Sequence, residues 1–242
     1  SIRKKITPKT RAILPVHIFG HPAEMNEIME IAKKHKLAVV EDCAQAFGAT
    51  SGGKVVGAIG DTGSFSFYPT KVLGCYGDGG MVTTNSDALN DHIRRLRNHG
   101  AAKPFIHVEI GMNSRLDEVQ AALLRLKLRT IKSDIAGRQQ VAAEYTKRLA
   151  GSAVKCPPLP KNGTHAFNLY TVRVPKRDAV RQALTDAQIG TSQCYPQGLH
   201  LQDVYKRLGY QPGSLPACEH ATAETLSLPI YPGMPLAHIE RV

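Results

Sequence analysis

The chain has 242 residues, 42% of them apolar and 6% aromatic, and a formal net charge of +11 at pH 7. This composition excludes a disordered or fibrous chain, and it is ample for a hydrophobic core in one large domain or two unequal ones. The basic residues are scattered along the sequence and are not gathered in one tract with interleaved aromatics. Solvated helix faces, or an anionic substrate, therefore explain the charge better than nucleic acid, and no nucleic-acid partner is expected.

The five cysteines lie far apart and form no C-x-x-C pair. Their number and spacing indicate neither a disulfide framework nor a zinc ribbon, and a reducing cytoplasm is the natural compartment. No secretory apolar segment follows the basic opening, and no later apolar run approaches the length of a membrane span. We therefore expect a soluble, cytoplasmic protein without a membrane partner.

The beginning of the chain has the pattern of a strand, a helix and a second strand. Residues 12–17 form a largely apolar run, and residues 23–35 carry helical periodicity. Residues 37–40 are wholly apolar, as expected of a strand buried on both faces of a parallel sheet. The second strand stops at Glu41 and Asp42, and the carboxyl ends of parallel strands are where open α/β sheets place their ligands.

A glycine-rich region follows. Glycines are frequent in residues 51–63 and 74–80, and between these stretches residues 64–67 alternate serine and phenylalanine. So many glycines indicate backbone that runs close to another group. After a predicted strand at 81–84, residues 88–97 are expected to be helical, and residues 116–149 to form one long helix or a bent pair. The apolar face of that helix is predicted to carry Val119, Ala122, Leu123 and Leu126.

Composition changes at residues 151–163, where three prolines and two glycines fall among polar residues. Such a stretch is typical of a domain boundary. We therefore divide the chain into residues 1–150, a large domain, and residues 151–242, a smaller one. In the smaller domain, residues 169–174 are strand-like, residues 178–187 are helical, and the remainder is expected to form loops around a site.

Lys71 and Asp42 are the residues best suited to carry chemistry. Schiff-base formation needs a lysine amine that can be neutral and shielded from water, and Lys71 stands in a buried-looking setting between an aromatic strand and a glycine-rich turn. Asp42 ends a predicted buried strand and could supply the anion that keeps a pyridine ring protonated. Each residue alone also has an ordinary explanation, as a solvated lysine or as an aspartate that caps a loop or helix.

Six segments around these residues decide between the explanations. They are 15–20 (PVHIFG), 40–45 (VEDCAQ), 65–71 (FSFYPTK), 77–80 (GDGG), 97–100 (RNHG) and 113–118 (NSRLDE). In these segments, and as far as 227–232 (SLPIYP), the chain resembles the DegT/DnrJ/EryC1/StrS family of sugar aminotransferases that depend on pyridoxal 5′-phosphate (PLP). The resemblance covers essentially the whole chain, and the combination is highly specific.

The resemblance implies an α/β protein of the type I PLP-dependent aminotransferase fold, with a mainly parallel sheet in the large domain and a smaller C-terminal α/β domain. It implies that Lys71 holds the cofactor as a Schiff base, that Asp42 pairs with its ring nitrogen, and that Gln45 lies near its phenolic oxygen. Ser66 would donate to the phosphate, and Asn113 would reach the phosphate from the partner subunit of a homodimer with composite active sites. The alternatives are a strand serine bonded to its own neighbours and an asparagine that caps a helix.

Three further residues are implied on the substrate side. Arg115 would lie near the substrate, with an ordinary surface charge as the alternative. Tyr195 and His200 fall in a segment that resembles the family's substrate-side loop, although a packed loop histidine explains His200 equally well. His17 and His21 have H-x-x-x-H spacing but no common helix face, so no metal site is predicted.

The implied activity moves an amino group from an amino acid donor, by family expectation glutamate, to a keto group of a nucleotide-linked sugar. The family's dehydratases place histidine where this chain has Lys71, which favours transfer over elimination. A PLP-dependent sugar dehydratase relative and a non-catalytic regulatory or binding protein on the same scaffold stay open. Family members normally begin with a phosphate-binding turn and an aromatic residue that stacks on the cofactor. Neither precedes the first strand here, so we expect the N-terminal part of the large domain to be absent.

Overall fold

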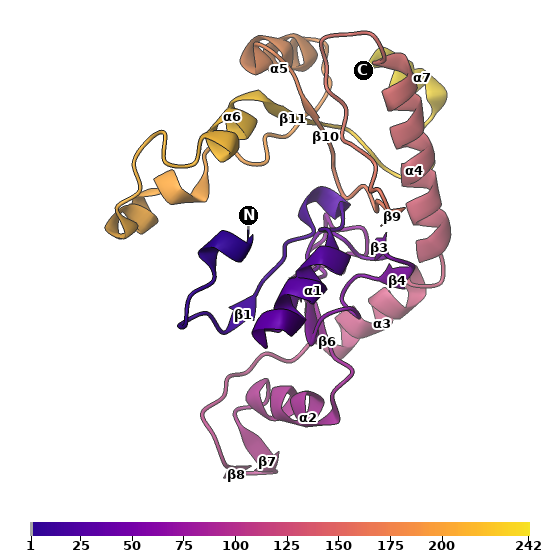
Figure 1. The fold of residues 1–242 in the computed structure, drawn as a ribbon. Coiled ribbons are helices and arrows are strands. Elements are labelled where there is room, and N and C mark those ends of the chain that lie inside the picture. Colours follow the sequence, from indigo (N-terminus) through magenta and orange to yellow (C-terminus); the bar gives the residue numbers. More distant parts are fainter. Residues whose placement is uncertain (1) are drawn as a thin grey trace. The chain divides into compact units, whose positions relative to one another are not determined.

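The computed structural model describes residues 2–242, which form two compact units (Figure 1). The first unit runs to Ile135 and adds Leu159–Asn168, and the second holds Ala136–Pro158 and Leu169–Val242. The division at residue 150 into a PLP-binding domain and a small domain remains a prediction. Across the described residues, none of the helices combines the length and apolarity needed to cross a bilayer.

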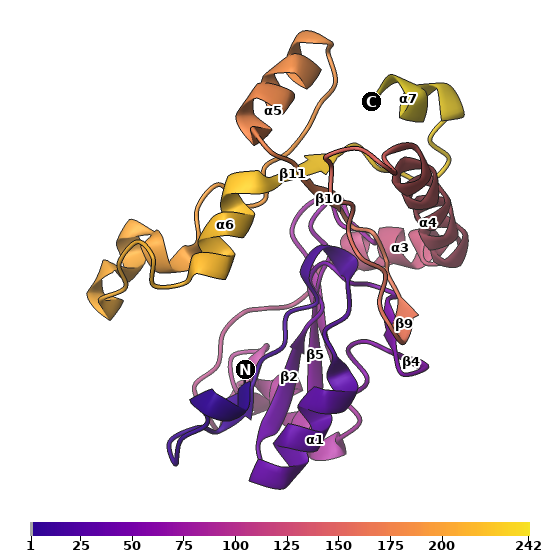
Figure 2. The same ribbon diagram turned by 45° about the horizontal axis from the view of Figure 1, so that its top comes forward.

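A four-stranded sheet in the order β1-β2-β5-β6 forms the centre of the first unit. Strands β1 (Ala12–Ile13), β2 (Ala38–Asp42) and β5 (Thr62–Ser66) are parallel, and β6 (Gly80–Thr83) pairs antiparallel with β5. Figure 2 shows β2 and β5 side by side, with α1 packed beside them. The predicted mainly parallel sheet is confirmed, although the strand expected at 12–17 is shorter. β1 ends at Ile13, and Val16 makes only an isolated bridge to Asp42.

Helix α1 (Met25–His35) packs against strands β1 and β2 with the apolar side that its periodicity predicts. Met25, Ile28, Ile31 and Ala32 are buried, and they pack with Ile13 of β1 and Val39 of β2. The helix ends at a left-handed residue, Lys36, whose N–H bonds back to the carbonyls of the last turn. Basic side chains in that turn offset the negative end of the helix dipole.

The other elements of the first unit are two helices and several shorter strands and 3-10 helices. The remaining strands are β3 (Thr50–Ser51), β4 (Lys54–Val55), β7 (Ala101–Lys103), β8 (Ile106–His107) and β9 (Gly163–Thr164). The remaining helices are η1 (Ile2–Lys5), η2 (Ile18–Gly20), α2 (Asp87–Leu96) and α3 (Glu118–Lys127). Figure 1 shows the β7–β8 hairpin beside α2. Because β9 pairs with β3, the chain returns to the first unit at residues 159–168.

The helical region expected at 116–149 is the bent pair, α3 followed by α4 (Ile131–Arg148). The predicted apolar face of α3 is wrong, because Val119 and Leu126 are 71% and 57% exposed. Leu124 is the buried position of this helix, and it belongs to a core cluster with Phe67 and Leu73. The helix therefore turns Leu124 toward the core and leaves its most apolar face, with Val119 and Leu126, exposed.

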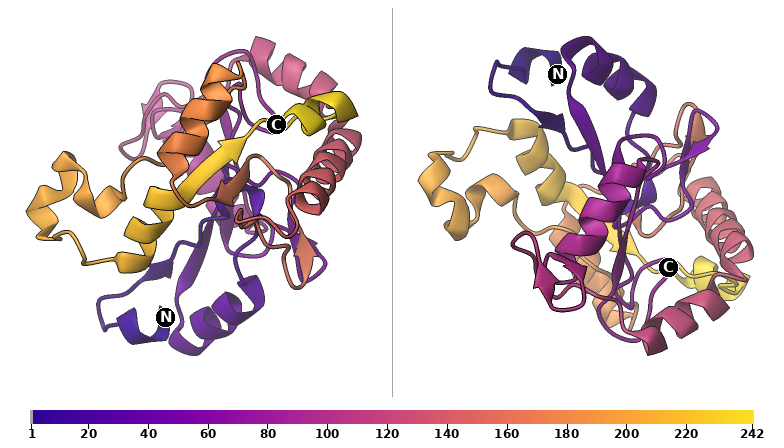
Figure 3. Two further views of the ribbon diagram at one scale, coloured as in Figure 1. Left: turned by 90° about the horizontal axis from the view of Figure 1, so that it is seen from above. Right: turned by 90° about the horizontal axis from the view of Figure 1, so that it is seen from below.

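The second unit is built on an antiparallel pair, β10 (Tyr170–Arg173) and β11 (Thr225–Leu228). Helices α5 (Arg177–Asp186), α6 (Pro216–Glu224) and α7 (Leu236–Arg241) belong to it, with the 3-10 helices η3 (Leu199–Leu201) and η4 (Asp203–Leu208). The strand expected at 169–174 and the helix expected at 178–187 are present, whereas β11, α6 and α7 replace predicted loops. In Figure 3 the segment with η3 and η4 extends away from the β10–β11 pair.

Candidate active site

Asp42 ends β2 in a tightly bonded stretch of backbone. Its N–H donates to the Pro15 carbonyl at 2.9 Å, and its own carbonyl accepts from His17 N–H at 3.0 Å. On the other side, Asp42 lies in register with Ser64 of β5, and the next N–H, that of Cys43, donates to the Ser64 carbonyl. The position of Asp42 is thus fixed from the segment after β1 on one side and from β5 on the other, at the carboxyl edge of the sheet.

The side chains of Asp42 and Gln45 are half-buried at this edge. Asp42 Oδ1 accepts from Ala44 N–H at 3.0 Å, while within residues 2–242 no hydrogen bond is made to Oδ2. Gln45 Oε1 accepts from the N–H of Phe19 at 2.6 Å. The carboxylate of Asp42 therefore has one oxygen oriented by its own turn and a second that remains available to a ligand.

Behind Asp42, on the opposite face of β2, Glu41 and His17 are fully buried. His17 Nδ1 accepts from Ala23 N–H at 3.0 Å, so Nε2 carries the proton and donates to Glu41 Oε2 at 3.1 Å. Burial raises the pKa of Glu41, but the hydrogen bonds from His17 and from three backbone N–H groups outweigh it and hold that pKa below its usual value.

His17, Glu41 and Cys43 offer ligand atoms within 4.8 Å of one another. Both nitrogens of His17 and both oxygens of Glu41 are already used by protein hydrogen bonds. Burial, followed by the charges of Glu41 and Asp42, raises the pKa of the Cys43 thiol, which opposes the thiolate that a metal needs. The cluster is therefore explained without a metal.

Lys71 lies on a loop that leaves β5 and closes on itself. The Phe67 carbonyl accepts from the N–H of Cys75 at 2.8 Å and from its thiol at 3.0 Å, and Lys71 N–H donates to the Tyr68 carbonyl. Lys71 is half-buried, not enclosed as the sequence suggested. Its ammonium makes no hydrogen bond or ion pair to the part of the chain that the structure describes.

Helix α3 holds the turn that follows Lys71. Lys127 Nζ donates to the Gly74 carbonyl at 2.6 Å and lies 5.0 Å from the centre of the Tyr76 ring. The Gln120 amide accepts from Tyr76 N–H at 2.8 Å and donates to the Tyr76 carbonyl. These contacts explain the rotation of α3, because Gln120, Leu124 and Lys127 share the inward side. Sequence reasoning missed both polar residues, since helical spacing alone does not identify their partner.

Ser66 is the last residue of β5 and is half-buried. Its Oγ accepts from the N–H of Tyr68, two residues later, at 3.3 Å. The sequence left open that Ser66 only bonds its own neighbours in the strand, and this bond is of that local kind. The hydroxyl proton can still be donated outward, so the bond is compatible with a phosphate ligand.

Asn113 and Arg115 lie together on an exposed segment of the first unit. Arg115 Nε donates to Asn113 Oδ1 at 3.2 Å, and Asn113 forms an isolated bridge with Asn98. Ser114 N–H donates to the Arg97 carbonyl. The two motif segments at 97–100 and 113–118 are therefore neighbours in space. Asn113 does not act as the helix cap considered from the sequence, since Asp117 occupies that position of α3.

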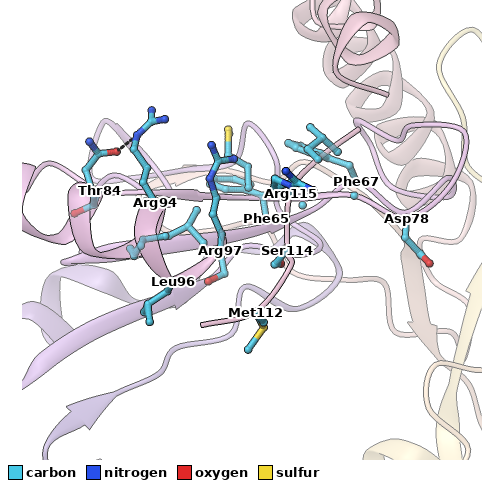
Figure 4. A pocket seen from close by; sticks show the side chains of 18 of the residues that line it. Phe65, Phe67, Asp78, Thr84, Arg94, Leu96, Arg97, Met112, Ser114 and Arg115 are labelled. Carbon is cyan, nitrogen blue, oxygen red and sulfur yellow. Dashed lines mark hydrogen bonds between the residues drawn. The ribbon is translucent and has the colours of Figure 1, made fainter. Parts of the chain in front are cut away.

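A hollow of about 890 Å³ lies between β5, β6, α2 and the segment at 112–117. Figure 4 shows the side chains of Arg94, Arg97 and Arg115 along it, with Phe65 and Met112. Arg115 is the one predicted site residue that lines it. The hollow is lined by Ser64, the register partner of Asp42 on β5, but Asp42 and Lys71 are not among the residues that line it.

Tyr195 and His200 belong to the second unit. Tyr195 is half exposed, at 51%. His200 is buried, and its Nε2 lies 3.1 Å from Glu219 Oε1. Glu219 also accepts from the N–H groups of Gly213 and Leu215. This geometry is that of a packed loop histidine, and its role toward a substrate stays a prediction.

In outline, Asp42 and Ser66 are the last residues of the neighbouring parallel strands β2 and β5, Gln45 follows shortly after Asp42, and Lys71 lies on the loop after β5. A family model matches this chain over residues 1–242. The protein belongs to the DegT/DnrJ/EryC1/StrS aminotransferase family. The predicted membership is thus confirmed.

Two relatives illustrate the range of names within the family. A "pleiotropic regulatory protein" of Geobacillus stearothermophilus is 45% identical over 96% of this chain and 63% of its own length. The dTDP-3-amino-3,4,6-trideoxy-alpha-D-glucose transaminase of Streptomyces venezuelae is 44% identical over 99% of this chain and 62% of its own length. The chain thus spans a little under two thirds of these proteins.

The crystal structure of S. venezuelae DesV is similar to this chain with a TM-score of 0.96 and 42% identity, over 99% of this chain and 65% of that one. The crystal structure of a DegT/DnrJ/EryC1/StrS aminotransferase from Brucella abortus has a TM-score of 0.90 and 38% identity, over 96% of this chain and 62% of that one. The predicted type I aminotransferase fold is confirmed by these likenesses.

Proposed function

We propose that this protein is a PLP-dependent aminotransferase that moves an amino group from an amino acid, glutamate by family expectation, to a keto group of a nucleotide-linked sugar. The proposal is supported by the positions of two residues in the chain: Asp42 ends β2, and Lys71 lies on the loop that follows its parallel neighbour β5. Each has a polar atom without a hydrogen-bond partner in residues 2–242. Partly buried charged groups without partners are costly unless a ligand uses them.

The residues at this edge fit the functional groups of PLP. Asp42 Oδ2 would accept from the ring nitrogen, Gln45 would lie beside the phenolic oxygen, Ser66 would donate to the phosphate, and the Lys71 amine would hold the aldehyde carbon. When bound, PLP supplies a protonated ring that accepts the negative charge developing on the substrate carbon.

The chain's own residues have distinct tasks in this scheme. The Asp42 carboxylate would accept from the ring nitrogen, and an anion there would favour the charged, protonated form of the ring. Once the donor amine replaces it on the aldehyde carbon, the freed Lys71 amine would carry a proton from the donor carbon to that cofactor carbon. In the second half of the cycle it would carry a proton from the cofactor carbon to the sugar carbon, as a base and then an acid. A lysine at this position favours transfer over the elimination that the sibling dehydratases carry out.

A second subunit completes the proposed site. Asn113 and Arg115 are exposed and hydrogen-bonded to each other, which keeps the amide oriented on an open surface. In a two-fold homodimer the pair would reach the phosphate and the substrate of the partner site. Tyr195 and His200 are proposed for the substrate side, and scattered positive charge favours a diphosphate there without specificity.

A regulatory role on the same scaffold is the second candidate, because one relative bears the name of a regulatory protein. The two candidates differ in whether Lys71 reacts. The test is half-transamination with glutamate and a panel of keto-sugar nucleotides, followed by visible absorbance. We expect a visible band that the donor bleaches and one keto-sugar nucleotide restores, and its loss in Lys71→Ala. The exposed Lys54→Ala is the matched control and keeps the band. A protein whose absorbance never changes with donor or acceptor would support the regulatory role.

A further inference from the structure

The buried carboxylate of Glu41 is the most completely bonded polar group at this edge of the sheet. Oε2 accepts from His17 Nε2 at 3.1 Å and from Gly57 N–H at 2.9 Å. Oε1 accepts from Ile59 N–H at 2.8 Å and from Gly60 N–H at 2.7 Å. Four donors from two loops therefore converge on one side chain of β2.

This arrangement is costly to build if Glu41 has only a packing role. A fully buried carboxylate loses its hydration, and an apolar side chain of similar volume would avoid that loss. The three backbone N–H groups in turn need an acceptor, because buried donors left unpaired are destabilising. Glu41 thus joins the turn at 57–60 and the segment after β1 to the end of β2.

The residue after Glu41 is Asp42, which points to the opposite face because side chains alternate along a strand. The segment that contains His17 also bonds the backbone of Asp42, through the Asp42 carbonyl at 3.0 Å. A displacement of the Glu41 side chain would therefore shift the Asp42 peptide, both along the strand and through His17, which bonds both residues. An error of about 1 Å in a reacting group's position can cost about 100-fold in rate.

We propose that Glu41 is a positioning residue that acts through Asp42. Its anion fixes the carboxyl end of β2, so that the Asp42 carboxylate is held at the ring nitrogen of the cofactor. Glu41 itself touches neither cofactor nor substrate. This inference rests on the proposed function, since it assigns a task to the neighbour of the residue that the proposed chemistry needs.

The first measurement is made without cofactor. Glu41→Gln replaces one oxygen by an amide that faces backbone donors, so hydrogen exchange should accelerate at the N–H groups of Gly57, Ile59 and Gly60. Glu109→Gln is the matched control, because the Glu109 carboxylate also accepts a hydrogen bond, from Arg95 Nε at 2.8 Å, but this partner lies on α2 and not on the turn at 57–60. Exchange at 57–60 should stay unchanged in that variant. Unchanged exchange at 57–60 in Glu41→Gln would overturn the proposal.

The second measurement is a double-mutant cycle on the half-reaction of the PLP-loaded protein with its amino donor. Glu41→Gln should slow the reaction about 10- to 100-fold in the wild-type background, and it should have almost no further effect in Asp42→Asn. Equal slowing in both backgrounds, or none in either, would refute a role through Asp42. If Glu41→Gln does not fold, His17→Gln serves in the same cycle, because it loosens the anchor while Glu41 keeps its charge.

The cycle also separates the two proposals. When the wild-type protein reacts and Asp42→Asn is impaired, but the effects of the two substitutions multiply, only the positioning role fails. When the wild-type protein does not react, or Asp42→Asn reacts normally, the proposed function fails and the positioning role fails with it.

Discussion

Gly20 and Gly53 provide a test of how tightly the loop before α1 is packed. Both have positive φ, +100° and +78°, so an alanine at either position adopts a strained backbone. At Gly20 a Cβ would lie 2.9 Å from Phe167 N, 3.0 Å from Asn168 N and 3.1 Å from the Gln45 carbonyl oxygen. At Gly53 the same atom would meet nothing within 4 Å.

The structure therefore predicts different costs for the same substitution. The positive-φ strain of an L-residue costs about 1–2 kcal/mol at each position. Overpacking against backbone that cannot rotate away adds about 1–3 kcal/mol at Gly20 alone. Gly20→Ala should thus lower the free energy of unfolding by about 2–5 kcal/mol, against about 1–2 kcal/mol for Gly53→Ala.

Urea denaturation of the two variants and the wild-type protein measures this difference. The midpoint should fall in both variants, and further in Gly20→Ala, with similar slopes. Equal midpoints for the two variants would refute the packing described between Gly20 and the segment at 167–168, because strain alone affects both glycines.

Three further predictions concern polar contacts. Lys127→Met should cost about 2 kcal/mol in unfolding free energy, since a charged hydrogen bond and a cation–π contact are lost, whereas the exposed Arg125→Met should leave urea stability nearly unchanged. Burial, and then a neighbouring histidine, lower the pKa of His165 to about 3, so the unfolded state takes up a proton near pH 6.5 while the folded state does not. Stability should therefore fall by about 2 kcal/mol from pH 6.5 to 5, and a His165→Gln variant that keeps this slope in urea titrations would contradict the assignment. Glu219→Gln should speed proteolysis of the segment at 198–215, because it weakens the bonds of Glu219 to His200, Gly213 and Leu215. The control Asp203→Asn removes only an exposed ion pair on that segment and should leave the cleavage rate unchanged. Equal cleavage rates in the two variants would count against the network around Glu219.

Features that depend on local periodicity were predictable from the sequence. The buried side of α1, at Met25, Ile28 and Ile31, follows from spacing alone, and so does the wholly apolar run that precedes Asp42. The position of Asp42 at the carboxyl edge of a parallel sheet follows from the order of strand, helix and strand. These elements bury side chains within a short stretch of chain, so their pattern is visible without knowledge of the rest.

Features that depend on which distant segments meet were not predictable. The inward side of α3 is set by contacts of Gln120 and Lys127 with the turn near Tyr76, more than forty residues earlier in the chain. The contacts with that turn decide which side of α3 faces inward, and the more apolar side with Val119 is left exposed. The burial of Glu41 likewise depends on a turn of backbone donors, and a glutamate in an apolar strand gives only a faint indication of it.

Lys71 is the residue on which the proposed chemistry depends, and its covalent bond to the cofactor can be measured directly. The protein is loaded with PLP, reduced with borohydride, digested and analysed by mass spectrometry. We predict that the mass of the reduced cofactor is found on the peptide that contains Lys71 and on no other. A label on a different lysine, or a protein that carries no label after reduction, would contradict the account.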